Sequence, residues 1–169
     1  MSSTQAQKAA IVTGASGGIG AAVAKRLARD GFAVVVHYAG NAASTEALVR
    51  EIEGAGGRAA SARADVADAT AVARLFDAAE AAFGGVDVLV NVAGTGHSTP
   101  LLELDLATWR EVLATDLDGA FLCLQRAARR MVAAGGGGRI VNVTSVHEHQ
   151  PRVGAAAYCA AKGGLALLR

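Results

Sequence analysis

The stretch Thr13–Gly20, TGASGGIG, lies between an apolar run of strand length, Ala9–Thr13, and a segment of helical length, Gly18–Arg29. Glycines at such a turn let the backbone turn tightly and approach a pyrophosphate without a clashing Cβ atom. The N-terminus of the following helix offers free N–H groups and a partial positive charge to phosphates. The turn therefore predicts a dinucleotide-binding site, with a purely structural glycine turn as the alternative.

Strands and helices alternate along the rest of the chain. Strands that are apolar on both faces, each followed by a helix, indicate a doubly wound α/β fold of the Rossmann type with a parallel sheet. We expect one dinucleotide-binding domain over residues 1–169. Ser44 or Thr45 is the expected N-cap of the second helix, and Asp68 of the third. Further strands are predicted at Phe32–Tyr38, Arg58–Ala64, Val86–Asn91 and Arg139–Thr144, and further helices at Ser44–Gly54, Asp68–Phe83, Ala107–Ala134 and from Ala155 onward.

The composition narrows the possible partners and locations. Hydrophobic residues make up 52% of the 169 residues and aromatic residues only 4%, which predicts an aliphatic core. A net charge of +1, from 16 basic and 15 acidic residues, gives no reason to expect nucleic acid or an anionic membrane as a partner. Met1–Lys8 lacks the pattern of a secretory signal, and no apolar run approaches membrane-spanning length. Since Cys123 and Cys159 form no disulfide or metal-binding pattern, the sequence predicts a cytoplasmic protein without a bound metal.

Tyr158 and Lys162 lie four residues apart on a predicted helix, which puts both side chains on one face. A free tyrosine has a pKa of about 10, and a nearby ammonium group favours the phenolate, which can act as a base. An ordinary helix face is the alternative for this pair taken alone. Ser145 favours the catalytic interpretation, because it follows a strand at the carboxyl edge where open parallel sheets bind ligands. His147 and His149 lack an evident third ligand, so we expect them in a loop bordering the substrate pocket, with no metal site.

Together these motifs resemble the short-chain dehydrogenase/reductase family over essentially the whole chain. The interval of thirteen residues between Ser145 and Tyr158 is the one that this family has. In the segment LVNVAG, residues 89–94, Val92 replaces the second asparagine of the family's Asn-Asn-Ala-Gly signature. The resemblance implies that the cofactor is bound by Gly14, Ser16, Gly18, Ile19 and Gly20 at its phosphates and ribose, by Asp65 and Val66 at its adenine, and by the signature residues Asn91, Ala93 and Gly94.

The resemblance also implies the catalytic roles. Tyr158 is the expected general acid/base and also a cofactor contact. Lys162 is the cation that stabilises its phenolate and also binds the cofactor ribose, and Ser145 is the donor to the substrate oxygen. Asp116 occupies the position where the family usually has a fourth catalytic residue, an asparagine. An aspartate there could still hold a relay water near Lys162, but its negative charge would oppose the phenolate.

The end of the second predicted strand bears on the choice between NAD and NADP. An acidic side chain there would bind the ribose hydroxyls of NAD and repel a 2′-phosphate. This position falls on Tyr38, and neither Tyr38 nor any of the next three residues is acidic. The sequence therefore favours NADP as the cofactor, with NAD as the second choice. Tyr38 is the expected cofactor contact at this position. No arginine follows Tyr38 to bind the phosphate, but His37 and Asn41 could offer hydrogen bonds to it.

The resemblance implies an NAD(P)-dependent oxidoreductase that transfers hydride between nicotinamide and a carbonyl or secondary alcohol. The segment from Ser145 to Gly164 looks most like the glucose 1-dehydrogenase branch of the family, followed by the 3-oxoacyl-carrier-protein reductases. A sugar or a 3-oxoacyl compound is therefore the expected small-molecule substrate. An inactive nucleotide-binding fragment and a structural or interaction subunit with the same fold are the alternatives.

The chain ends at Arg169, inside the predicted helix that carries Tyr158 and Lys162. Family members continue through two more strands and a substrate-covering loop, so we expect the last strands to be missing and the domain to be C-terminally incomplete. The strand Arg139–Thr144 would then form an apolar edge of the sheet with unpaired backbone groups. A full-length form is expected to be a homo-oligomer, because the long helix and the last helix form the dimer interface in the family.

Overall fold

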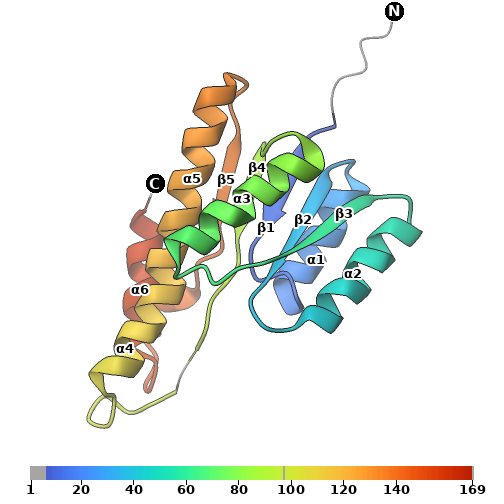
Figure 1. The fold of residues 1–169 in the computed structure, drawn as a ribbon. Coiled ribbons are helices and arrows are strands. Elements are labelled where there is room, and N and C mark those ends of the chain that lie inside the picture. Colours follow the sequence, from blue (N-terminus) through green and yellow to red (C-terminus); the bar gives the residue numbers. More distant parts are fainter. Residues whose placement is uncertain (1–6, 97, 169) are drawn as a thin grey trace, which may run out of the picture.

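Five parallel strands form one sheet in the computed structural model, which describes residues 7–96 and 98–168 (Figure 1). The strands lie in the order β3-β2-β1-β4-β5. The chain adds strands outward from β1 to β3 and then crosses to the other side of β1, which confirms the predicted doubly wound parallel sheet. The strands are β1 Ala9–Val12, β2 Ala33–Tyr38, β3 Arg58–Arg63, β4 Val88–Asn91 and β5 Arg139–Asn142.

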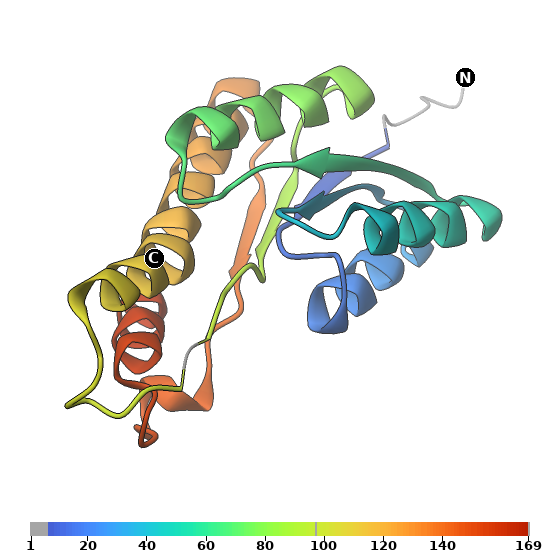
Figure 2. The same cartoon turned by 60° about the horizontal axis from the view of Figure 1, so that its bottom comes forward.

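Helices cover both faces of this sheet (Figures 1 and 2). They are α1 Gly18–Arg29, α2 Ala42–Gly54, α3 Ala69–Phe83, α4 Leu106–Leu113, α5 Gly119–Ala134 and α6 Ala156–Leu167. Ile11 and Val35 pack with apolar residues of α3 and α5, whereas their neighbours Val12 and Val36 pack with those of α1 and α2. Since neighbouring strand residues point to opposite faces, the strands are apolar on both. Within the described ranges, no helix has the length and apolar character that crossing a bilayer requires.

The helix starts agree only in part with the sequence. Asp68 caps α3 as predicted, because its side chain accepts a hydrogen bond from the Thr70 N–H at 2.7 Å. The prediction for α2 is wrong, since Asn41 is the N-cap and its Oδ1 accepts from the Ser44 N–H at 3.1 Å. Thr45 instead lies inside the first turn, and its hydroxyl donates to the Asn41 carbonyl oxygen at 2.8 Å. The chain therefore enters α2 two residues earlier than predicted.

The long helix predicted over Ala107–Ala134 is one helical stretch in the structure, but its hydrogen-bonding pattern changes in the middle. A π-helical turn over Ala114–Asp118 joins α4 to α5. Turns of this kind are frequent at functional sites, and this one buries Asp116 completely. A Cβ atom on the next residue, Gly119, would lie 2.7 Å from the Val66 Cγ2 atom. Glycine here therefore lets the helix approach the loop after β3.

The fifth strand is shorter than predicted and lies at an edge of the sheet in the described residues. β5 ends at Asn142, and a 3₁₀ turn follows over Val146–Glu148. The Val143 N–H still donates to the Asn91 carbonyl of β4 at 2.9 Å, but the Val143 carbonyl accepts from the Lys162 side chain. The backbone therefore leaves the sheet at Val143, the residue whose carbonyl oxygen contacts Lys162.

Gly20 in α1 lies directly against the turn that precedes the helix. A Cβ atom there would overlap the Gly14 carbonyl oxygen and lie 2.8 Å from the Ala15 Cα atom. We predict that Gly20→Ala lowers the free energy of unfolding by about 1–3 kcal/mol, because these backbone atoms cannot rotate away. Gly17→Ala is the matched control, since Gly17 is extended and a Cβ there meets no atom within 4 Å. Urea unfolding measures both variants, and equal stability of the two would contradict the prediction.

Candidate active site

The strand order creates a crevice between β1 and β4, where the direction of strand addition reverses. Open parallel sheets bind ligands at such a point, beyond the carboxyl ends of the strands. A cavity of about 510 Å³ lies there, within the usual size of a small-molecule site. Its lining consists of Gly14, Ser16, His37, Ala39, Gly40, Arg63, Asp65, Val66, Val92, Ala93, Gly94 and Thr115.

Most of the residues predicted to bind a dinucleotide lie in or beside this cavity. Tyr38 ends β2, immediately before the lining residue Ala39. Asn91 is buried elsewhere, since its Nδ2 donates to Asn142 Oδ1 at 2.9 Å and to the Ala120 carbonyl at 3.3 Å. Asn91 therefore joins β4 to β5 and α5 and does not line the cavity. The predicted residues in the lining are Gly14, Ser16, Asp65, Val66, Ala93 and Gly94, while Gly18, Ile19 and Gly20 form the first turn of α1.

The glycine turn brings two strand ends into backbone contact. Gly14 has a φ of +63°, and a Cβ atom there would lie 2.7 Å from the Ala93 Cα atom. The Thr13 hydroxyl accepts hydrogen bonds from the N–H groups of Val92 at 3.0 Å and Ala93 at 3.1 Å. Among residues 7–96 and 98–168, no side chain caps the N-terminus of α1, and its first turn holds no acidic residue. The N–H groups of this turn are therefore available to an anionic ligand.

His37 ties this turn to two further strands. Its Nδ1 accepts a hydrogen bond from the Gly14 N–H at 3.0 Å, and its Nε2 lies 3.1 Å from the Ala64 carbonyl oxygen. Because Nδ1 accepts, the ring proton must reside on Nε2, which donates to Ala64. The expectation that His37 could bind a cofactor phosphate is therefore wrong, since both ring nitrogens are used inside the protein. Burial lowers the pKa of His37, against the raising effects of the Ala64 carbonyl and Asp65.

A second hollow lies at the same edge of the sheet. Ser145 and Tyr158 both line it, so the structure brings these two predicted catalytic residues together. The Ser145 Oγ accepts from the His147 N–H at 3.2 Å. The His147 ring lies edge-on to the Tyr158 ring with centroids 6.3 Å apart, so His147 borders the hollow as predicted. The complete lining is Gly96, Ser98, Ser145, His147, Arg152, Ala155 and Tyr158.

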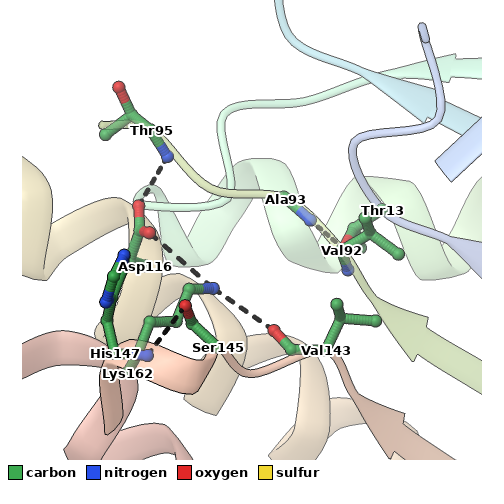
Figure 3. A network of polar contacts seen from close by, with 9 residues as sticks. All are labelled: Thr13, Val92, Ala93, Thr95, Asp116, Val143, Ser145, His147 and Lys162. Atoms are coloured by element: carbon green, nitrogen blue, oxygen red, sulfur yellow. Dashed lines mark hydrogen bonds and ion pairs between the residues drawn. The ribbon is translucent and has the colours of Figure 1, made fainter. Parts of the chain in front are cut away.

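Lys162 lies behind this hollow and is only 4% exposed. Its Nζ donates to the Val143 carbonyl oxygen at 3.3 Å and lies 3.7 Å from Asp116 Oδ2 (Figure 3). The same ammonium lies 5.6 Å from the centre of the Tyr158 ring. At 3.7 Å, Lys162 and Asp116 form an ion pair that is too long for a hydrogen bond. The predicted tyrosine, lysine and aspartate thus form a chain of neighbours that begins at the hollow and ends in the interior.

Burial and neighbouring groups shift the pKa values of both Asp116 and Lys162. Burial raises the pKa of Asp116, against the lowering effects of the Thr95 N–H, which donates to Oδ1 at 2.6 Å, and of Lys162. Burial likewise lowers the pKa of Lys162, against the raising effect of Asp116. A Cβ atom on Gly94 would lie 2.9 Å from Asp116 Oδ2, so glycine makes room for this carboxylate. The Asp116 carboxylate therefore interacts with the Thr95 N–H through Oδ1 and with the Lys162 ammonium through Oδ2.

The histidines near the hollow do not converge on a common point. His147 Nδ1 lies 2.9 Å from the Gln150 carbonyl oxygen, whereas His149 Nε2 lies 2.8 Å from Glu148 Oε1. In the part of the chain that the structure describes, no group of three histidine, cysteine or acidic side chains could hold a metal ion. His97, which the sequence suggests at the mouth of the pocket, lies outside the described residues.

Arg63 is a cavity residue that the sequence analysis missed. The pairing of β2 with β3 places Arg63 directly opposite Tyr38, and Arg63 lines the cavity. No arginine follows Tyr38 in the chain, but the strand pairing brings Arg63 beside it. Aligning the second and third predicted strands in parallel could have identified Arg63, because parallel strands have their carboxyl ends at the same edge of the sheet.

Comparison with known proteins identifies the family. The sequence model of the short chain dehydrogenase family matches residues 8–169. The chain belongs to this family. It is 46% identical over 164 residues to the cis-4-hydroxycyclohexanecarboxylate dehydrogenase of Sinomonas cyclohexanicum, with 96% of this chain and 65% of that protein covered. It is 42% identical over 156 residues to a 3-oxoacyl-[acyl-carrier-protein] reductase of Synechocystis, with 92% of this chain and 63% of that protein covered.

Solved structures of short chain dehydrogenases have the same fold. A dehydrogenase/reductase from Sinorhizobium meliloti superposes with a TM-score of 0.91 at 44% identity, over 97% of this chain and 64% of that one. The chain thus spans slightly less than two thirds of the length of these relatives.

His37 gives this short chain dehydrogenase a predicted dependence of stability on pH. Its pKa in the folded chain lies below the ordinary value of 6.5, so the unfolded chain binds a proton at a higher pH than the folded chain does. The free energy of unfolding must therefore decrease as the pH falls below about 6.5. We predict that His37→Gln weakens this decrease relative to the wild type. Urea unfolding between about pH 7 and pH 5 measures the two slopes, and identical slopes would contradict the prediction.

Proposed function

We propose that this chain is an NAD(P)-dependent oxidoreductase that transfers hydride between nicotinamide and a carbonyl or secondary alcohol. The observation that carries the proposal is the meeting of Ser145 and Tyr158 in one hollow, with the Lys162 ammonium buried behind them. The loop after β4 contributes Gly94 to the cavity at the glycine turn and Gly96 to this hollow. A cofactor in the cavity would therefore have its reactive end near the hollow.

The cavity fits a dinucleotide in shape and charge. Gly14 has no side chain where one would collide with Ala93, and Gly17 and Gly18 leave open space at the start of α1. The uncapped first turn of α1 has the N–H groups and the dipole orientation that favour a pyrophosphate. Asp65 and Val66 line the same cavity and are the proposed contacts of the adenine.

The positions of the side chains support the following catalytic roles. A bound nicotinamide would supply the hydride in reduction and accept it in oxidation. In reduction, the Ser145 hydroxyl donates a hydrogen bond to the substrate carbonyl oxygen, and the Tyr158 hydroxyl gives that oxygen its proton. The Lys162 ammonium stabilises the tyrosinate that remains, and Asp116 holds the ammonium in place. In oxidation, the tyrosinate takes the proton from the alcohol.

Several finer assignments belong to this proposal. We propose NADP as the cofactor, with NAD as the alternative, because no carboxylate lies at the end of β2. The substrate is a small molecule of the sugar or 3-oxoacyl type, and the similarity to a 3-oxoacyl reductase supports the second.

Exposed Phe121 on α5 and Leu167 on α6 support assembly of copies through these helices. The free thiols of Cys123 and Cys159 are in keeping with the reducing cytoplasm.

Cofactor binding and turnover test the proposal separately. We expect saturating NADPH to raise the unfolding temperature of the chain, because a ligand at one hundred times its Kd stabilises the folded state by about 2.7 kcal/mol. Tyr158→Phe should keep most of this stabilisation and lose oxidation of NADPH with sugar and 3-oxoacyl substrates, since it removes one hydroxyl group, the proton donor. An unfolding temperature that neither NADPH nor NADH changes would contradict the proposal. Stabilisation without turnover would favour a nucleotide-binding protein.

Asp116 offers a second test of the proton-transfer assignment. We predict that Asp116→Asn keeps or raises kcat/KM, because an amide oxygen can still accept from Thr95 while the negative charge beside Lys162 is removed. Asp118→Asn, an exposed position of the same π-helical turn, is the matched control. The unfolding temperature is measured in parallel, since breaking a buried ion pair can destabilise a protein by about 3–5 kcal/mol. A collapse of kcat/KM in a folded Asp116→Asn protein would show that the carboxylate itself is required.

A further inference from the structure

We infer that Arg63 binds the 2′-phosphate of NADP, an inference that rests on the proposed binding of a dinucleotide. The parallel pairing of β2 and β3 puts Arg63 directly opposite Tyr38. The end of β2 is where dinucleotide-binding folds distinguish a free ribose from a phosphorylated one. A residue 25 positions further along the chain therefore reaches the position where the sequence suggests no cation.

The Arg63 side chain is held toward this end of β2. Its Nε donates to the carbonyl oxygen of Ala39, the first residue after β2, at 3.0 Å. In the described part of the chain, its two Nη nitrogens make no hydrogen bond or ion pair with protein atoms, and the residue is exposed. The guanidinium group therefore keeps four N–H donors for a ligand while one N–H fixes its position. A phosphate is a good acceptor for such a planar, permanently charged group.

The charges around Arg63 favour an anion. Among the described residues that line the cavity, Arg63 is the only permanent cation and Asp65 the only acid. Asp65 Oδ1 already accepts a hydrogen bond from the Ala67 N–H at 2.9 Å. The loop that Arg63 contacts leads into α2, a helix of 13 residues whose first turn holds no acidic residue. A phosphate beside Ala39 would thus lie between the guanidinium group and the positive end of a helix dipole.

A purely structural role for Arg63 makes a different prediction. If the side chain serves only to hold the Ala39 carbonyl, its loss should weaken the binding of every adenine nucleotide to the same degree. If it binds the 2′-phosphate, its loss should weaken only the nucleotides that carry this group. The two roles therefore separate when two ligands that differ by one phosphate are compared.

The test is calorimetric titration of the whole chain with two nucleotides, adenosine 2′,5′-bisphosphate and adenosine 5′-monophosphate. It measures the affinity for each. We expect the bisphosphate to bind at least about tenfold more tightly to the wild type, as charge-assisted hydrogen bonds predict. Arg63→Gln should remove this preference and change binding of the monophosphate less than about twofold, and Arg63→Lys should retain part of the preference. Arg58→Gln, at the opposite end of β3 and also exposed, is the matched control and should bind as the wild type does.

Each outcome of this experiment decides between the two roles. Equal affinities of the wild type for the two nucleotides would overturn the inference and leave dinucleotide binding intact. An equal loss of both affinities in Arg63→Gln would also overturn it, in favour of the structural role. Binding of neither nucleotide by the wild type would contradict the proposed function as well. Tyr38→Asp is a second variant that leaves Arg63 in place, and its carboxylate should selectively weaken the bisphosphate.

Discussion

The backbone contact between the ends of β1 and β4 at Gly14 is the constraint on which the rest of the site depends. A single methyl group at this position would lie 2.7 Å from the Ala93 Cα atom, so only glycine permits the approach. The strand ends leave backbone N–H groups without ladder partners, and buried N–H groups must be satisfied. Thr13 and His37 accept these hydrogen bonds, which fixes the turn against its three neighbouring strands. The cavity is therefore shaped by backbone atoms.

The loop after β4 connects this turn with the buried Asp116–Lys162 pair (Figure 3). Ala93 contacts the glycine turn, whereas the next residues, Gly94 and Thr95, contact the Asp116 carboxylate. The end of the loop at the glycine turn thus depends on close packing, and its other end depends on a buried pair of charges. Because burial opposes both charges, the Asp116–Lys162 pair depends on its hydrogen bonds to Thr95 and Val143.

Position 116 holds an aspartate where the family resemblance implies an asparagine. An asparagine would leave the Lys162 ammonium with a neutral partner, whereas the carboxylate attracts it directly at 3.7 Å. The π-helical turn presents this carboxylate to the ammonium without exposing it to water. Part of the positive charge of Lys162 is therefore balanced by a carboxylate that is buried, as the lysine is.

The sequence by itself determined the features that depend on short-range patterns. The apolar strands with intervening helices defined the parallel sheet, Gly14 and its neighbours defined the turn, and helical spacing placed Tyr158 and Lys162 on one face. The tertiary structure alone decided what depends on strand register and on burial. It turned His37 inward, made Asn41 the N-cap of α2 and brought Arg63 beside Tyr38. These outcomes depend on which backbone groups far apart in the chain become neighbours in the fold. A local sequence pattern does not specify such contacts.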